Sequence, residues 1–173
     1  MKIKAHNDRE LLAAFAAAFV VQDYNIYGRP TWPPFAFPTP AAEYHLLARS
    51  LPSVLPPLYE KLVLSYRWPE VGLPAFALYP NPPGPLIEGI LMHMRADNRL
   101  WNTQISAGYL AFGSGAGGCY DRVCFDTNRR LADGDCPIVQ IDHEQVLCYE
   151  HVRIVSELAE SFRSLVMDSI RPG

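Results

Sequence analysis

Two clusters of proline limit how this chain can fold. The first lies within residues 28–40 and contains five prolines, and the second spans Pro80–Pro85. Because proline lacks an amide donor and fixes its own φ, neither cluster suits a helix interior or a central strand. We expect the first to be an extended arm whose Trp32, Phe35 and Phe37 pack onto the domain. The second marks the start of a section with a different pattern.

Three segments before the second cluster have the apolar period of a helix. Asn7 or Asp8 can cap a helix over residues 9–23, and Thr39 can cap another that begins at Pro40 and ends near Ser50. The strongest period follows, and its apolar residues are Leu55, Leu58, Tyr59, Leu62, Val63 and Tyr66. Pro56 and Pro57 are tolerated there because they occupy the first turn.

The apolar run Leu11–Val21 could be mistaken for a targeting segment. Its eleven residues are too few to span a bilayer, which takes about 20. Asp8 and Glu10 directly precede it, where a secretory signal would carry positive charge. We therefore expect a folded helix in a cytoplasmic protein.

The section after the second cluster has mainly the pattern of strands. The expected strands are Phe76–Tyr79, Ile87–Met92, Trp101–Ile105, Tyr109–Gly113, Cys119–Asp126 and Ile138–Asp142. Ser156 is expected to cap a closing helix whose apolar face carries Leu158, Phe162, Leu165, Val166 and Ile170. Because strands and helices are segregated along the chain, the sequence predicts one α+β domain over residues 1–173. Its largely antiparallel sheet should be flanked by N-terminal helices and a C-terminal helix.

No motif of this section points to catalysis or to a cofactor. The glycines between Gly113 and Gly118 precede a strand and not the helix that a phosphate loop needs, so we expect a turn between strands. Asp142 and His143 would point to opposite faces if their strand continued. The four cysteines lack the paired spacing of a zinc site, and free thiols are expected. We expect no catalytic residue, no metal and no cofactor.

The charge of the chain is unevenly distributed. Residues 119–150 contain seven acidic residues and three arginines, a net charge of −4, whereas the whole chain carries −3. The overall charge disfavours non-specific binding to nucleic acid. The local excess has two interpretations, solvated strand edges and turns, or an acidic face for a basic partner.

The C-terminal half resembles the SUKH superfamily. The resemblance rests on Tyr109–Gly113, Tyr120–Asp126, Cys136–Glu144 and the closing helix with Ser161-Phe162, and upstream on the Leu-Pro-plus-aromatic entry at Leu55–Tyr59. It covers residues 41–168, and residues 1–40 add a helix and the proline-rich arm. It implies a twisted sheet flanked by helices and no shared catalytic residues. It also implies an immunity protein that neutralises a toxin, or a regulatory interaction module.

Three functional hypotheses follow. The first is an immunity-type protein that binds a cognate bacterial toxin domain, such as a basic nuclease-type one, without binding nucleic acid or membrane. The second is a regulatory or scaffolding module with another protein partner, and the third is a small hydrolase that uses a thiol or His143. For the protein-binding hypotheses, the expected contact residues are Tyr120, Asp121, Asp126, Asp142 and Glu144.

Overall fold

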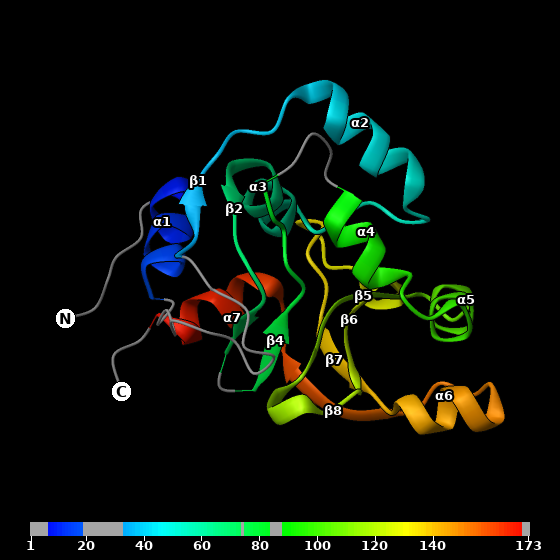
Figure 1. Ribbon diagram of the computed structural model, residues 1–173. Coiled ribbons are helices and arrows are strands. Elements are labelled where there is room, and N and C mark those ends of the chain that lie inside the picture. The colour runs from blue at the N-terminus through cyan, green and yellow to red at the C-terminus, as the bar shows by residue number, and fades with distance from the viewer. Residues whose placement is uncertain (1–6, 19–32, 74, 84–87, 171–173) are drawn as a thin grey trace.

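A six-stranded antiparallel sheet forms the centre of the computed structural model (Figure 1). The structure describes residues 7–18, 33–73, 75–83 and 88–170. The strands of the sheet are β3 Val71–Gly72, β4 Phe76–Leu78, β5 Tyr109–Gly115, β6 Arg122–Asp126, β7 Ile138–Ile141 and β8 Ile154–Ala159. Each strand pairs antiparallel with the next one along the chain. The predicted α+β domain with a largely antiparallel sheet is therefore confirmed.

The described helices lie on both sides of this sheet (Figure 1). They are α1 Asp8–Ala18, α2 Ala41–Ser50, α3 Pro57–Ser65, α4 Glu88–Met94, α5 Asn98–Ser106, α6 His143–Tyr149 and α7 Phe162–Ser169. Two 3₁₀ turns, η1 Ala116–Gly118 and η2 Thr127–Arg129, follow β5 and β6. The first of them is the predicted glycine turn between two strands. Its Gly117 and Gly118 have φ of 66° and 81°, where a side chain would be strained.

The two faces of the sheet bury different sets of side chains. Alternate residues of a strand point to opposite faces. Phe125 and Ile138 therefore join the larger core with α3 and α7, while Cys124 and Val139 join a smaller one with Leu100 and Val146. Because both faces are covered, β5, β6 and β7 are apolar along most of their length.

Aromatic rings fill the larger core. Tyr59 of α3 lies 5.1–5.5 Å, between ring centroids, from Phe112, Phe125 and Phe162. Phe112 and Phe125 stack at 4.1 Å. Burial raises the pKa of the Tyr59 phenol. Its hydroxyl is buried without a hydrogen-bond partner among the described residues.

Tyr59→Phe should leave the free energy of unfolding unchanged or raise it by up to about 1 kcal/mol, because the removed hydroxyl costs desolvation and makes no bond. Urea denaturation would measure the change. Tyr44→Phe is the matched control, since the pKa of the Tyr44 phenol is raised by burial and by the nearby Glu60, so this hydroxyl has a polar neighbour to lose. That variant should lose about 0.5–1.5 kcal/mol. A larger loss in Tyr59→Phe than in Tyr44→Phe would contradict the assignment.

The N-terminal helix packs onto the C-terminal one. The side chain of Asn7 accepts from the amide of Glu10 and so caps α1. Phe15 meets Phe162 edge-on at 6.4 Å, and Asp8 accepts from Lys61 of α3 and Arg163 of α7. The expected helix at the N-terminus is confirmed over Asp8–Ala18, and the rest of its predicted range lies outside the described residues.

The described part of the proline-rich arm, residues 33–40, is extended, as expected. Strand β1, Phe35–Ala36, pairs antiparallel with β2, Tyr66–Arg67, in a separate two-stranded sheet. The guanidinium of the buried Arg67 lies 5.1 Å from the ring centroid of Phe37. Phe37 stays partly exposed, and Trp32 lies outside the described residues.

Two predicted strands are helices. Ile87–Met92 falls largely in α4, and Trp101–Ile105 falls in α5. A short apolar run fits either structure, and tertiary packing decides between them. The side chain of Asp97 accepts from the amides of Arg99 and Leu100 and caps α5.

The expected cap of the last helix is also wrong. Ile154–Ala159, which includes Ser156, forms the edge strand β8. The helix begins at Phe162, where Ser161 and Ser164 bond reciprocally in a capping box. Thr39 likewise does not cap α2, because its hydroxyl donates to the carbonyl of Val63.

Candidate functional site

Four of the five predicted contact residues lie together where β6, β7 and α6 meet. Arg122 of β6 is paired with Ile141 of β7, so the residues just outside this pair, Asp121 and Asp142, lie near each other. Strand β7 ends at Ile141, and the Asp142 carboxylate accepts from the Gln145 amide at 3.1 Å as the N-cap of α6. The condition under which Asp142 and His143 would point to opposite faces is not met, because the strand ends at Ile141.

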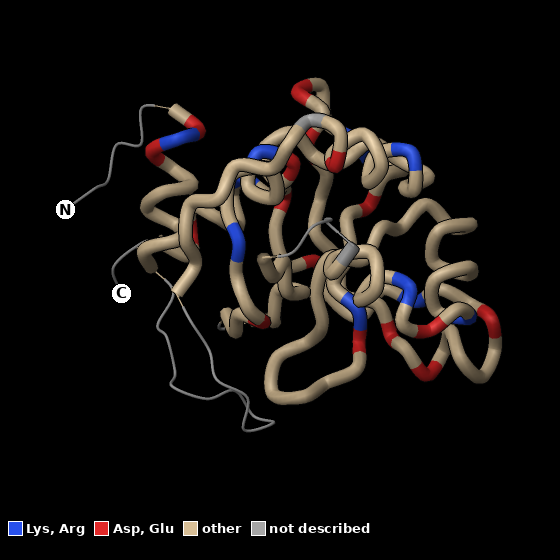
Figure 2. The backbone as a smooth tube through the Cα atoms, turned by 45° about the horizontal axis from the view of Figure 1, so that its top comes forward, with Lys and Arg blue, Asp and Glu red and all other residues tan. Residues whose placement is uncertain are grey.

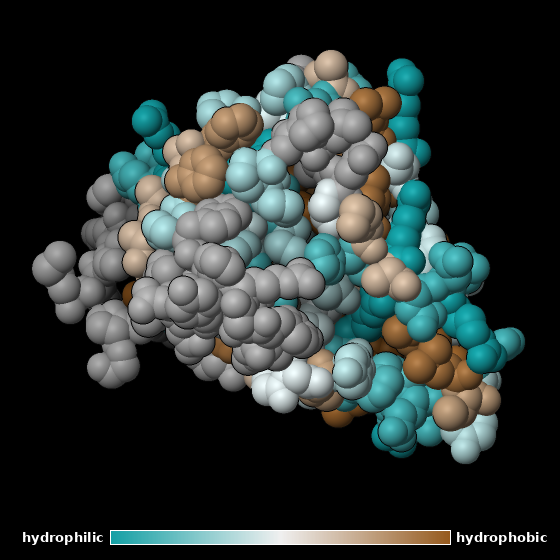
Figure 3. All heavy atoms as spheres, viewed as in Figure 1, coloured by the Kyte–Doolittle hydropathy of each residue, from teal (hydrophilic) through white to brown (hydrophobic). Residues whose placement is uncertain are grey.

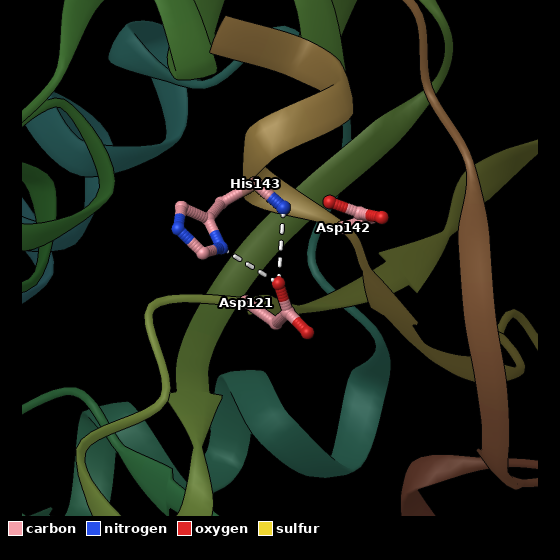
Figure 4. A group of neighbouring side chains, drawn as sticks. All are labelled: Asp121, Asp142 and His143. Carbon is pink, nitrogen blue, oxygen red and sulfur yellow. Dashed lines mark hydrogen bonds and ion pairs between the residues drawn. The ribbon is translucent and has the colours of Figure 1, made fainter.

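His143 is held by Asp121 through two contacts. One Asp121 oxygen, Oδ1, accepts from the His143 backbone amide at 3.0 Å and lies 2.8 Å from Nδ1 of its ring. The other nitrogen of the ring faces away from both carboxylates (Figure 4). Because an ionised carboxylate only accepts, Nδ1 carries the proton in this contact. Gln140 donates to the second oxygen of Asp121 at 3.4 Å.

These contacts favour the ionised form of Asp121. Partial burial raises the pKa of this carboxyl, but the side-chain and backbone hydrogen bonds from His143 outweigh it, and the pKa lies below its ordinary 3.8. A lowered pKa in the folded state means that the unfolded chain binds the proton more readily. The stabilisation is therefore present above the ordinary pKa and is lost as pH falls through the folded value.

Asp121→Asn should lower the free energy of unfolding by about 1–2 kcal/mol at neutral pH, because hydrogen bonds to a charged acceptor are replaced by bonds to a neutral one. The difference from the wild type should shrink as pH falls below the ordinary value of 3.8. Urea denaturation across this pH range checks both statements. Asp133→Asn, at an exposed position, is the control and should show little change. A loss in Asp121→Asn that is independent of pH would contradict the role of the charge.

Asp121, Asp142 and His143 form a small polar cluster at the junction of β6, β7 and α6. Asp121, Asp142 and His143 offer ligand atoms within 4.8 Å of one another, which would suit a metal ion. However, Asp142 also accepts from Arg153 at 2.6 Å, and every carboxylate oxygen of Asp121 and Asp142 already holds a donor. The cation of Arg153 beside the cluster further opposes metal binding. The hydrogen bonds of this polar cluster connect β6, β7, α6 and the start of β8. The residues suit this structural role better than they suit a metal centre.

Exposed side chains surround this polar cluster. Tyr120 is 75% exposed, and its ring centroid lies 5.7 Å from that of His143. Glu144 is exposed on the first turn of α6. Hydrophobic side chains gather between α5 and α6 on the face that Figure 3 shows, within a hydrophilic surround. We call Tyr120, Asp121, Asp142, His143 and Glu144 the α6 patch.

Asp126, the fifth predicted contact residue, is not a surface residue. It is 2% exposed and lies at the opposite end of β6 from Asp121. Its carboxylate accepts from the Asn128 amide at 3.2 Å and from the Arg129 guanidinium at 2.7 Å, and so caps η2. An acid followed by such partners serves the local turn, and Asp126 leaves the set of contact residues.

Most of the acidic residues between positions 119 and 150 have a hydrogen-bond or ion-pair partner within the protein. Asp135 is buried, Asp142 pairs with Arg153, and Glu150 pairs with Arg99 of α5. Figure 2 accordingly shows basic and acidic positions interleaved along this part of the backbone. The assumption that these acids face solvent is wrong for Asp126 and Asp135. The partners Gln140, Arg99 and Arg153 were not anticipated, because only the fold brings them close.

The cysteines are free thiols in two environments. Cys124 and Cys136 are buried, and burial raises the pKa of both, so neither thiol is a ready nucleophile. Cys119 and Cys148 are exposed. The Cys119 thiol lies close enough to Asp121 to help lower the pKa of that carboxyl, and the same carboxylate holds His143.

Comparison of the chain with protein-family models, with curated proteins and with solved structures finds no match. The resemblance to the SUKH superfamily therefore stays a prediction. None of the described helices combines the length and apolarity needed to cross a membrane.

Proposed function

We propose that the protein is an immunity-type protein that binds and neutralises a cognate bacterial toxin domain. The antiparallel sheet with helices on both sides is compatible with the fold that the resemblance implies. The agreement of fold supports the proposal without naming a partner.

The observation that carries the proposal is the α6 patch. Tyr120 is exposed to solvent beside the polar cluster, in which hydrogen bonds fix His143 on Asp121. Aromatic side chains are typical centres of protein interfaces. Glu144 is exposed beside it, so the patch suits a partner whose contact surface is basic. A nuclease-type toxin domain has such a surface where it binds phosphates.

The test is binding kinetics against the toxin domain encoded by the neighbouring gene. Tyr120→Ala should weaken binding by about 2 kcal/mol, mainly through faster dissociation. Glu144→Lys should slow association and flatten its dependence on salt. The controls are Met92→Ala on α4 and Glu70→Lys between β2 and β3, which are exposed elsewhere and should bind as the wild type does.

Two outcomes would contradict the proposal. Wild-type kinetics in both α6-patch variants would place the contact surface elsewhere. Failure of the wild-type chain to bind that toxin, together with capture of another protein through Tyr120, would favour a regulatory interaction module. Turnover of an ester or nucleotide substrate that is lost in His143→Ala would favour the hydrolase hypothesis.

A further inference from the structure

Strand β8 is an open edge of the central sheet. It is the last strand in the order β3-β4-β5-β6-β7-β8, and β7 alone among the described strands pairs with it. Ile154 and Val155 are 43% and 50% exposed. An edge with unpaired backbone groups and exposed apolar side chains is a template for pairing with a further strand.

Lysine and proline, two of the usual protections of such an edge, are missing from β8, although its pairing with β7 is irregular. Its register with β7 shifts twice, so that Val155 and Leu158 have no partner on β7. Bulges often protect an edge, and so do lysine and proline. Here the residues outside the register are apolar, and residues 153–160 contain neither lysine nor proline.

The sequence of β8 is complementary to itself in one antiparallel register. With the twofold axis between Ser156 and Glu157, the facing pairs from the two copies are Arg153 with Glu160, Ile154 with Ala159, and Val155 with Leu158. Each pair occurs twice by symmetry. Opposite charges and apolar side chains that face each other across strands stabilise the pairing. In this register, the two residues that β7 leaves unpaired face each other.

The charges near the axis are compatible with this pairing. Glu160 is exposed and has no ion-pair partner among the described residues. Arg153 bonds to Asp142 through one nitrogen and has further donors for a second carboxylate. Glu157 lies next to the axis and pairs at 2.9 Å with Arg129, which also bonds to Asp126. Each charge near the axis therefore has a partner of opposite sign, either in its own copy or across the axis.

We propose that β8 pairs antiparallel with β8 of a second copy of this chain, in the register that sets Arg153 opposite Glu160. The pairing joins two six-stranded sheets into one continuous sheet. It buries Ile154 and Val155 and needs no change at Tyr120 or Glu144, so it is independent of the proposed function.

Sedimentation velocity of the full chain, from low to high micromolar concentration, tests the pairing. The wild type should show a reversible monomer–dimer equilibrium. Val155→Lys should raise the dimer dissociation constant at least about tenfold, because a charge enters the interface twice. Val54→Lys is the matched control, since Val54 is 70% exposed outside β8, and its dimer should be as tight as that of the wild type.

A charge exchange tests the register. Glu160→Arg places two arginines opposite each other and should weaken the dimer, and adding Arg153→Glu should restore it. Circular dichroism and thermal melting establish that each variant is folded. A monomer at every concentration overturns the proposal, as does a dimer that Val155→Lys leaves unweakened. If the double variant associates no more tightly than Glu160→Arg alone, the register is wrong and the proposal fails.

Discussion

Asp135→Ala should lower the free energy of unfolding by about 3–5 kcal/mol, because a buried charged acceptor is removed from several donors at once. Asp135 is 3% exposed. Its carboxylate accepts from the backbone amides of Cys136, Phe162 and Arg163 at 2.8–3.1 Å. Two of these amides belong to the first turn of α7, which has no carbonyl of its own helix to bond there. The side chain thus fastens the start of α7 to the loop before β7.

Two further variants separate the charge from the hydrogen bonds. Asp135→Asn keeps one acceptor oxygen, and it should lose roughly half as much stability as Asp135→Ala. Asp133→Ala changes the same type of residue at an exposed position two residues earlier and should lose less than about 1 kcal/mol. Urea denaturation measures all three. Equal stability of Asp135→Ala and Asp133→Ala would show that α7 does not depend on this carboxylate.

Asp135 also shows why the burial of some acidic residues between positions 119 and 150 cannot be predicted from the sequence. An acid in a turn faces solvent unless distant donors reach it, and the amides that reach Asp135 lie 27 and 28 residues further along the chain. No local pattern reports such a contact. By contrast, Asp126 is followed by Asn128 and Arg129, which satisfy it, so its role in a turn was visible nearby.

The strands β5, β6 and β7 could be predicted because they are covered on both faces. Their residues form short continuous apolar runs bounded by turn residues, and they have too few residues between turns to form a helix. Helices α4 and α5 have equally short runs, in which Ile90 and Met94, or Leu100 and Gln104, are buried four residues apart. That spacing is helical, but in α4 the apolar Leu91 and Met92 hide it, and in α5 one of the two buried residues is the polar Gln104.

Four of the five members of the α6 patch could be predicted from the sequence, but their geometry could not. Tyr120, Asp121, Asp142 and Glu144 stand out as aromatic and acidic residues beside strands. Their meeting depends on the register of β6 with β7, which pairs Arg122 with Ile141 and so brings two carboxylates near each other. Like charges in that position would repel, but Arg153 pairs with Asp142, and the backbone and ring nitrogens of His143 contact Asp121.

Phe15→Ala should destabilise the protein by about 3–5 kcal/mol, because truncating a fully buried phenylalanine leaves a cavity as well as losing apolar contact. Phe15 is fully buried between α1 and the rest of the core, and its ring meets Phe162 edge-on. Leu11 and Leu12 are buried beside it. The effect should therefore report how far the N-terminal helix is part of the cooperative unit.

Phe37→Ala is the matched control for this truncation. Phe37 is 41% exposed on the arm, so its loss should cost about 1 kcal/mol, most of it from contact with Arg67. Thermal melting should separate the two variants clearly, since for a chain of this size each kcal/mol shifts Tm by roughly 2–4 °C.

Combining Phe15→Ala with Phe162→Ala should lower the free energy of unfolding by less than the sum of the two single losses, because each substitution removes the other's contact. If Phe15→Ala had the same Tm as the wild type, α1 would not be part of the cooperative unit. The bonds of Asp8 to Lys61 and Arg163 could not by themselves keep α1 packed on the core, because ion pairs at a partly exposed position contribute little stability.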